Sequence, residues 1–240
     1  MDNQGYITLT RQMGLMREMQ VVANNIANAA TNGFRQEGVT FSEYVRSVDD
    51  GASVSMGQGN VGTTAFDQGT LSETGGTFDF AIEGDGFFLI ETAKGERLTR
   101  AGAFSPNGEG DLVTMDGNRV LDVGGAPLFV PPDAQTISVS PDGTISADGL
   151  LVGQMGLVMP TEPKDMVRES GVMFRADTGF EPAENGRIMQ GFVENSNVET
   201  ITQLARMIEV QRAYELGQSF LETEDERIRR AMDTMVRQNN

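Results

Sequence analysis

Proline and glycine are concentrated in the middle of this 240-residue chain. All eight prolines and 24 of the 29 glycines lie within residues 47–194. Proline cannot donate the backbone hydrogen bond that a helix interior needs, and glycine favours turns. The sequence therefore predicts a helix at each end of the chain and a β-rich middle.

The first segment carries apolar residues at helical spacing. They recur every three or four positions and predict a helix over about residues 4–30. Gly33, in Thr31-Asn32-Gly33, is expected to take the left-handed conformation that favours glycine at a helix end. The apolar positions are Tyr6, Leu9, Met13, Met16, Met19, Val22, Ala23 and Ile26.

The last segment has the seven-residue repeat of a coiled-coil seam and predicts a helix over 197–238. The repeat is half polar, which disfavours an isolated two-stranded coiled coil and predicts a helix with several neighbours. A second apolar strip contains Ile201, Ala205 and Ile208. The seam positions are Met207, Tyr214, Leu221, Ile228 and Met235, and the companion positions are Leu204, Gln211, Gln218, Asp225 and Met232.

Short β-type runs fill the middle, separated by Asn-Gly and Asp-Gly pairs that favour tight hairpins. The expected fold class is α+β: a coiled-coil-like pair of terminal helices brackets an antiparallel all-β domain, with an extended, glycine-rich connector. The expected domains are 1–35 with 195–240 (helical assembly), 36–79 (connector) and 80–194 (outer, β-rich). The predicted strands are Phe87–Glu91, Arg97–Arg100, Asp111–Met115, Arg119–Leu121, Ile137–Val139, Thr144–Ser146 and Gln154–Val158.

Charge is also divided along the chain. The net charge is −17, and residues 47–194 hold eight basic against 23 acidic side chains, so the middle carries −15. This balance excludes nucleic acid and anionic membrane surfaces as partners, because both require clustered Lys and Arg. Near-neutral ends suit segments that pack closely, although chance segregation is the alternative. No membrane helix and no cleavable secretory signal are expected from the sequence.

Candidate catalytic and cofactor motifs are weak. The absence of cysteine and histidine removes thiol nucleophiles, imidazole catalysis and most zinc sites. Gly57-Gln58-Gly59-Asn60-Val61-Gly62 has dinucleotide-fingerprint spacing without the required strand and helix, so a connector is expected there. Asn107, Glu109 and Asp111 alternate like calcium ligands, but Asn118 stands where an EF-hand needs Glu, which favours a turn. No enzyme activity, cofactor or metal is expected.

Three asparagines crowd one turn of the first helix in Asn24-Asn25-Ile26-Ala27-Asn28. Asparagine is a modest helix former, so its concentration beside small alanines needs a reason. We expect side-chain amides that hydrogen-bond across a tight helix–helix contact, with a polar solvent-facing surface as the alternative.

The two ends together resemble one family. Residues 23–35 (ANNIANAATNGFR) are similar to the N-terminal signature of bacterial flagellar rod and hook proteins. Glu194-Asn195-Ser196-Asn197-Val198-Glu199, followed by residues 207–215 (MIEVQRAYE), resembles the C-terminal signature of the same family. Residues 66–75, 82–88 and 99–104 resemble the family's segments between the helices and the β domain. The resemblance thus covers nearly the whole chain.

The resemblance implies a non-enzymatic subunit of a helical drive shaft in the periplasmic basal body, exported by the flagellar type III apparatus. It implies a homo-oligomeric helical array with other rod proteins, in which the terminal helices form the inner wall. Met1-Asp2-Asn3 and Thr10-Arg11-Gln12-Met13 are most similar to a proximal-rod member, with the distal-rod paralogue as the alternative. A secreted glycan-binding or glycan-hydrolysing β domain is the alternative from another class.

The residues expected to make packing contacts lie on both terminal helices. The set combines apolar positions with the asparagine cluster and is offered for assembly, not for chemistry. Its members are Leu9, Met13, Met16, Asn24, Asn25, Ile26, Asn28, Leu204, Met207, Ile208, Gln211, Tyr214, Leu221 and Ile228.

Overall fold

The computed structural model describes residues 3–46, 54–183 and 185–238. The chain divides into two compact units. We call Met1–Ala27, Gln36–Ala65 and Glu199–Asn240 the helical unit, and Asn28–Arg35 with Phe66–Val198 the β unit. The chain passes between the two units four times, so each unit is assembled from segments distant in the sequence.

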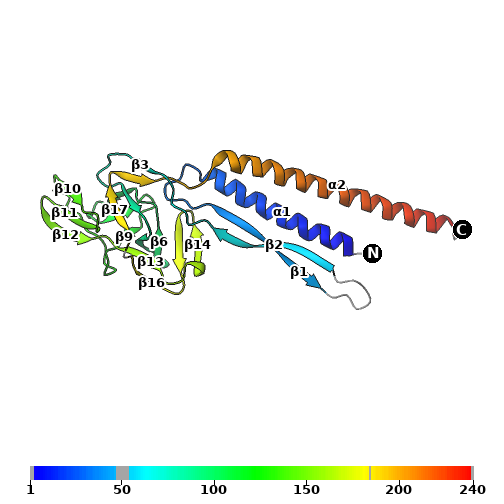
Figure 1. Cartoon of the computed structure of the whole chain (residues 1–240), viewed down its shortest axis with the longest axis horizontal. Helices are drawn as coiled ribbons and strands as arrows, with labels where there is room; N and C mark the ends of the chain where they lie inside the picture. The colour runs from blue at the N-terminus through cyan, green and yellow to red at the C-terminus, as the bar shows by residue number, and fades with distance from the viewer. Residues whose placement is uncertain (1–2, 47–53, 184, 239–240) are drawn as a thin grey trace. The chain divides into compact units, whose positions relative to one another are not determined.

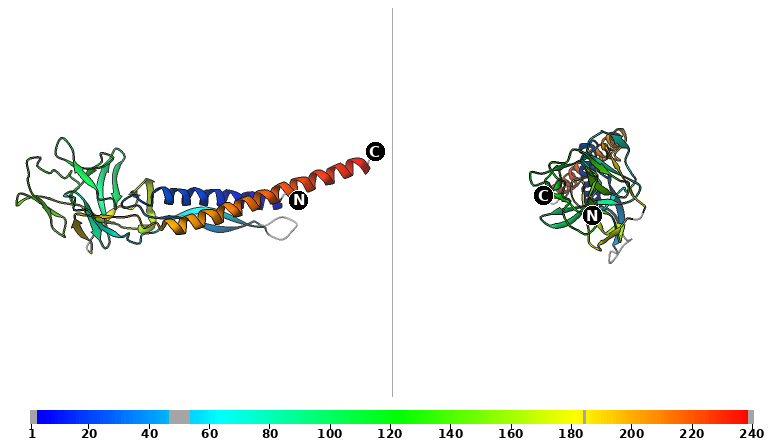
Figure 2. Two further views of the ribbon diagram at one scale, coloured as in Figure 1. Left: turned by 90° about the horizontal axis from the view of Figure 1, so that it is seen from above. Right: turned by 90° about the vertical axis from the view of Figure 1, so that its left-hand side faces the viewer.

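The helical unit contains two helices and one hairpin (Figure 1). Helix α1 spans Asn3–Ala27 and helix α2 spans Thr200–Gln238. Strands β1 (Glu37–Arg46) and β2 (Val54–Thr64) pair antiparallel, with a register irregularity between Thr40 and Phe41. Helix α1 packs against α2 and against both strands. Helix α2, with 39 residues against 25 in α1, continues past the N-terminal end of α1 (Figure 2).

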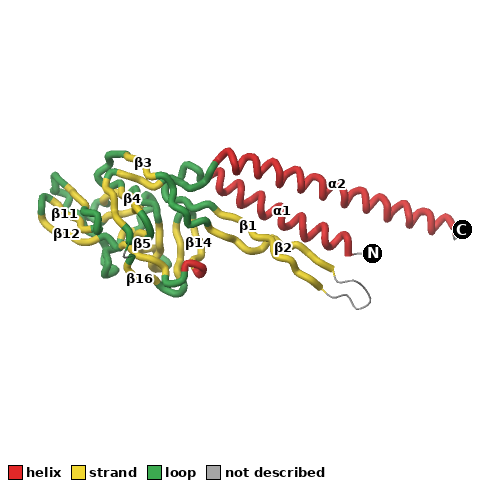
Figure 3. Tube along the Cα trace, viewed as in Figure 1, coloured by secondary structure: helices red, strands yellow, loops and turns green. Residues whose placement is uncertain are grey.

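The predicted fold class is wrong in two respects. First, much of the expected extended connector is paired strand: β1 and β2 form a hairpin of the helical unit, drawn in yellow in Figure 3. The glycines did not prevent pairing, because β1 supplies hydrogen-bonding partners; Gly59 lies opposite Phe41 and Gly62 opposite Val39. The run Gly57–Gly62, which was expected to be connector, therefore lies within strand β2. Residues 47–53 of the expected connector lie outside the described part of the chain.

Second, the terminal helices do not form a coiled-coil-like pair on their own. Because α1 divides its surface between α2 and the hairpin, the arrangement has three components rather than a two-helix seam. The helices are also shorter than the predicted 4–30 and 197–238, since α1 ends at Ala27 and α2 begins at Thr200.

The β unit is built from antiparallel strands. Its largest sheet has the order β14-β15-β6-β5-β9-β8-β7, and β13 joins it by pairing with both β5 and β16. Smaller groups are β10-β11-β12, β17-β4 and β18-β3. A short 3-10 helix, Pro163–Asp165, precedes β14. The strands are β3 Leu71–Glu73, β4 Phe80–Glu83, β5 Phe87–Thr92, β6 Gly95–Thr99, β7 Phe104–Pro106, β8 Leu112–Thr114, β9 Arg119–Val120, β10 Ile137–Val139, β11 Thr144–Ala147, β12 Leu150–Gln154, β13 Leu157–Pro160, β14 Met166–Ser170, β15 Met173–Ala176, β16 Phe180–Pro182, β17 Arg187–Gln190 and β18 Phe192–Glu194.

The first four residues of strand β5, Phe87–Ile90, are all apolar and buried. Phe88 and Ile90 belong to one buried apolar cluster, and Phe87 and Leu89 belong to another. Successive side chains of a strand point to opposite faces, so a strand covered on both faces needs apolar residues at every position. The β unit consequently has a core on each side of β5.

The predicted turns and strands have mixed outcomes. Asp142-Gly143 and Asp116-Gly117 turn between paired strands, and both glycines have positive φ, as predicted. The predicted strand Gln154–Val158 is wrong, because β12 ends at Gln154 and β13 begins at Leu157. Between them Met155 makes an isolated bridge with Asp122, where the chain changes its partner from β11 to β5.

Candidate assembly surface

The contact between α1 and α2 buries few large apolar side chains. Among the helical-unit residues whose exposure is described, the buried apolar side chains are Leu15, Val22 and Val210. Four polar side chains are buried as well: Gln12, Glu18, Asn25 and Gln203. A seam with so little apolar burial gives the helix pair little hydrophobic stabilisation of its own.

The asparagine cluster contributes one buried anchor. Asn25, 1% exposed, donates through Nδ2 to the Glu37 carbonyl at 2.8 Å and to Gln203 Oε1 at 3.2 Å. It also accepts the Glu37 amide at 2.9 Å, so one side chain links α1 to β1 and α2. The expected amide contact between helices is thus present at Asn25. Asn24 is exposed and donates to Glu37 Oε2, and Asn28 accepts from the Thr31 hydroxyl.

The least exposed side of α2 agrees only in part with the predicted seam. Three of the seam positions lie on it, but the companion positions are shifted by one residue. Met207, Tyr214 and Leu221 are half-buried, as the repeat suggested, but Ile228 is exposed. The predicted companion positions Leu204 and Gln211 are exposed, and their preceding residues, Gln203 and Val210, are buried instead. The hydropathy pattern favoured Leu204 over Gln203, but Gln203 can be buried because its side chain hydrogen-bonds to Asn25.

Large apolar side chains remain exposed along both helices. On α1, Leu9, Met13 and Met16 lie 52%, 65% and 54% exposed at spacings of four and three, which places them on one side of the helix. Ile26 is half-buried, and the Tyr6 side chain lies outside the described residues. The exposed apolar side chains of α2 are Ile201, Leu204, Ile208, Leu216, Phe220, Ile228, Met232 and Met235.

A buried ion cluster, the Glu194 clasp, joins the segments of the β unit that lead to and from the helices. The carboxylate of Glu194, fully buried, pairs with Arg35 and with Arg100, whose Nη1 lies 3.2 Å away. Its Oε1 accepts the Gly69 amide at 3.0 Å, and its carbonyl accepts the Gly33 amide at 2.7 Å. Burial lowers the pKa of Arg100 to about 10, against the opposing effect of Glu194. The clasp therefore fastens residues 33–35, 67–69 and 194 in one place.

Gly33 is part of this clasp and not of a helix end. Its φ of +71° is left-handed, as predicted, but α1 ends six residues earlier. A Cβ at position 33 would overlap the backbone of Arg100 and Ala101. Glycine is therefore needed for close backbone approach as well as for its conformation.

An arginine sandwich adjoins the clasp. The Arg168 guanidinium lies 4.6 Å from the ring centroids of both Phe34 and Phe174, and its Nη2 donates to the Arg35 carbonyl at 2.6 Å. Reading the sequence alone missed both features. Arg35, Arg100 and Glu194 did lie in the segments that resemble the family, which was the available signal.

Sites for chemistry are sparse in the described residues. No group of three or more potential metal ligands is present there. The Asn107 side chain accepts the Glu109 and Asp111 amides at 2.9 Å, so the calcium-like spacing forms a turn. An apolar hollow of the β unit is lined by Ile90, Met115, Val172 and Met173 with one carboxylate, Asp116, whereas glycoside hydrolysis generally uses two. Neither described helix has the length and apolar character to cross a membrane.

Comparison with known proteins identifies the family. Residues 81–147 match the family model of the flagellar hook protein FlgE/F/G D1 domain, and residues 189–234 match that of the flagellar basal body rod FlgEFG protein C-terminal region. The FlgF rod protein of Caulobacter vibrioides is 36% identical, with all of both chains covered. The FlgF protein of Mesorhizobium japonicum is 39% identical over 88% of each chain. The FlgG rod protein of Bacillus subtilis is 32% identical over 92% of this chain and 94% of its own.

These matches confirm the resemblance read from the sequence, including the greater similarity to FlgF than to its paralogue FlgG. They cover both helices and the β unit in the order that the two terminal signatures implied. The chain belongs to the family of flagellar basal-body rod proteins that includes FlgF and FlgG.

Proposed function

We propose that this chain is a structural subunit of the flagellar rod whose exposed helical side chains pack against neighbouring subunits. The observation that carries the proposal is the exposure of Leu9, Met13 and Met16 on α1 together with Ile201, Leu204 and Ile208 on α2. Large apolar side chains that are exposed together along a helix mark an interaction site. Its neighbours would be copies of this chain and other rod proteins, as the names of its relatives suggest.

The contacts would build an open array. In this array the exposed apolar positions on α1 of one copy would meet those on α2 of the next. Such heterologous contacts extend without closing when their rotation does not form a ring. In that array, residues 1–35 with 195–240 would form the assembly part and 80–194 the outer part. The strongly acidic middle favours an outer, solvated position, because like charges oppose close packing.

The similarity to FlgF proteins supports a finer proposal. We place the subunit in the proximal rod, within the periplasm, reached through the flagellar export apparatus without a cleaved signal, where it transmits torque without enzymatic activity or cofactor. The distal rod is the alternative, supported by the FlgG relatives. Cryo-electron microscopy of basal bodies carrying this chain, with an added density tag, distinguishes the two by the height of the tag along the rod.

A charge on the α1 surface tests the assembly role. Met13→Asp should abolish swimming, because a carboxylate would be desolvated at a subunit contact. The chain's own fold should hardly change, since Met13 is 65% exposed. The measurement is the spread of swimming cells through soft agar, with circular dichroism of the purified chain as the check on folding.

Met115→Asp is the matched control for this test. Met115 is 84% exposed in the β unit, so the substitution introduces the same carboxylate in place of the same side chain outside the proposed surface. Normal swimming by Met13→Asp, at normal protein abundance, would contradict the proposed assembly surface.

A further inference from the structure

The contact between α1 and α2 is crossed by a series of buried polar contacts. Gln12, Glu18 and Asn25 of α1 are each at most 7% exposed, which is unusual for three polar residues on one helix. Each meets a different point on α2. We call these three contacts the polar ladder.

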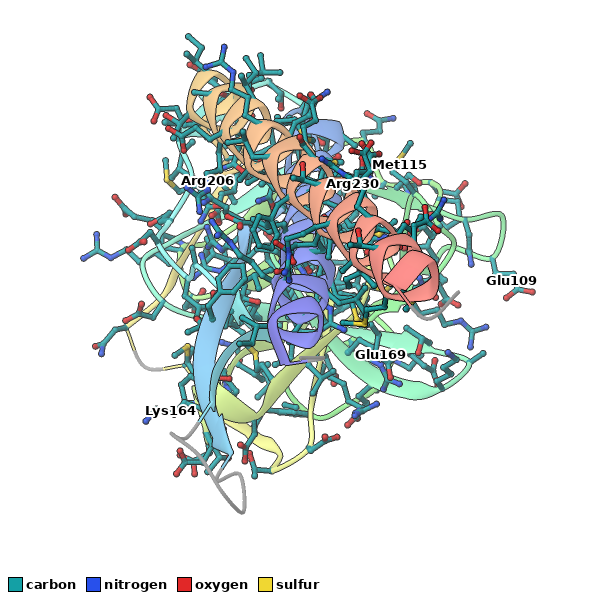
Figure 4. All side chains as sticks on the ribbon, turned by 90° about the vertical axis from the view of Figure 1, so that its right-hand side faces the viewer. Glu109, Met115, Lys164, Glu169, Arg206 and Arg230 are labelled. Atoms are coloured by element: carbon teal, nitrogen blue, oxygen red, sulfur yellow. The ribbon has the colours of Figure 1, made fainter. Side chains whose placement is uncertain are left out.

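Each contact of the polar ladder has specific geometry. Gln12 Nε2 donates to the Tyr214 carbonyl at 3.0 Å. Glu18 Oε1 accepts from Arg206 Nε at 2.7 Å and from Nη2 at 2.6 Å. Asn25 donates to Gln203 at 3.2 Å. Arg206 is labelled on α2 in Figure 4, and its hydrogen bond with Glu18 raises its pKa above the ordinary value.

The order of the contacts defines one alignment of two antiparallel helices. Positions 12, 18 and 25 ascend along α1 while their partners 214, 206 and 203 descend along α2. A slip of one helical turn moves the helices by about 5.4 Å and separates all three pairs. Each separation leaves a buried polar group without its partner, which is far more costly than shifting one apolar side chain along another.

Gly217 adds a steric element to the same alignment. A Cβ at this position would overlap Gln12 Nε2 and lie 3.1 Å from its Cδ. The close approach allows Gln12 to reach the backbone of α2. Because any Cβ would fill this space, the Gln12 side chain fits against α2 beside Gly217.

We infer that the polar ladder, together with Gly217, fixes the axial register of α1 against α2. Polar contacts in a helix seam specify alignment where apolar packing alone permits several. The register matters for the surface, because it sets the position of Leu9, Met13 and Met16 relative to the exposed side chains of α2. A slip would present a different surface to any neighbour.

Disulfide cross-linking tests the register directly, because the chain has no cysteine. In the otherwise native chain, Gln12→Cys with Gly217→Cys should cross-link, since a Cβ at 217 lies 3.6 Å from the Gln12 Cγ. The slipped pairs combine Gln12→Cys with Ala213→Cys or with Leu221→Cys, one turn to either side, and should remain reduced. Rods assembled in cells are oxidised with copper–phenanthroline, and intrachain bonds are read from mobility on non-reducing gels.

The ladder is then removed without leaving buried charge. Glu18→Leu, Arg206→Leu and Gln203→Leu together replace its remaining polar contacts by apolar side chains, which commonly preserves packing. We expect cross-linking of at least one slipped pair to rise at least fivefold in this background, because one alignment is no longer selected. As a control, Gln20→Leu, Arg212→Leu and Glu215→Leu change exposed positions of the same helices and should leave the pattern unchanged.

Three outcomes would overturn the inference. They are failure of the 12–217 pair to cross-link in the chain with an intact ladder at 18 and 25, an unchanged pattern after ladder removal, and loss of all cross-linking after ladder removal. The last would mean that the polar contacts hold the helices together without selecting their alignment. The assembly proposal is judged separately, by whether Met13→Asp abolishes swimming.

Discussion

The two units of this chain differ in how completely they bury their large apolar side chains. In the β unit, apolar side chains such as Phe88, Ile90 and Phe174 are at most 1% exposed and gather in two clusters around β5. In the helical unit, by contrast, several large apolar side chains are at least half exposed, among them Met13 at 65% and Ile208 at 50%. The β unit thus carries its own core, whereas the helical unit leaves much of its apolar surface for something outside the chain.

This difference separates two sources of stability. A domain with a dense core is stabilised by its own packing, while helices with an unfilled apolar surface gain stability from partners through mass action. We therefore expect substitutions in the β unit to change the stability of the single chain most. Substitutions in the helical unit should act mainly when partners are present.

The largest effect on the isolated chain is expected at the Glu194 clasp. Glu194→Ala leaves Arg35 and Arg100 buried without their shared carboxylate and should lower the free energy of unfolding of the β unit by about 3–5 kcal/mol. Thermal unfolding followed by circular dichroism measures it. Glu181→Ala, at an exposed position of β16, should change the free energy by no more than about 0.5 kcal/mol. A similarly small effect at Glu194 would show that the clasp does not support the unit.

The same substitution in both units sharpens the comparison. Leu89→Ala, in a buried cluster on one face of β5, should lower the free energy of unfolding by about 2–5 kcal/mol. Leu15→Ala, in the contact between α1 and α2, should cost less in the dilute chain, because that contact has few apolar neighbours to lose. Denaturant unfolding of both variants gives the two values, and equal costs would contradict the view that the helical unit lacks a core.

The smallest effect is a pH dependence at the β14–β15 hairpin. Hydrogen bonding from Arg97, and then from Arg175, lowers the pKa of Glu169 below its ordinary value of 4.5. A lowered carboxylate pKa contributes stability that is complete above pH 4.5 and is lost as the pH falls through the lowered value. The melting temperatures of the native chain and of Glu169→Gln should therefore converge between pH 6 and pH 3.

The control for this titration is Glu181→Gln, which removes an exposed carboxylate from the same unit. Its melting temperature should follow that of the native chain at every pH. A constant gap between the native chain and Glu169→Gln over this range would mean that the ionised Glu169 contributes no pH-dependent stability.

The sequence predicted those helices, strands and turns that are determined by residues close together in the chain. The helices at both ends, the run Phe87–Glu91 in β5 and the turn at Asp142-Gly143 follow from spacing and turn chemistry within a few residues. The companion positions on α2 were misplaced because the choice between Gln203 and Leu204 depends on Asn25, far away in the chain. The pairing of β1 with β2 was missed because glycine-rich composition describes preference and not the presence of a partner strand.

The clasp was beyond prediction for a related reason. Charged residues are normally expected at the surface. Here Arg35, Arg100 and Glu194 are buried, because both guanidinium groups form ion pairs with the Glu194 carboxylate. Only the fold brings together positions separated by 65 to 159 residues in the chain, as the numbers 35, 100 and 194 show. The candidate assembly positions on α1 were, by contrast, accessible to sequence reasoning, because their spacing is local to one helix.

Hydrogen exchange, measured on the dilute full chain and on purified basal bodies, tests most directly whether the helical unit depends on neighbours for its order. We predict fast amide exchange along α1 and α2 in the dilute chain, slow exchange of the same amides in basal bodies, and slow exchange of β5 in both. Strong protection of α1 and α2 in the dilute chain would contradict this dependence on neighbours.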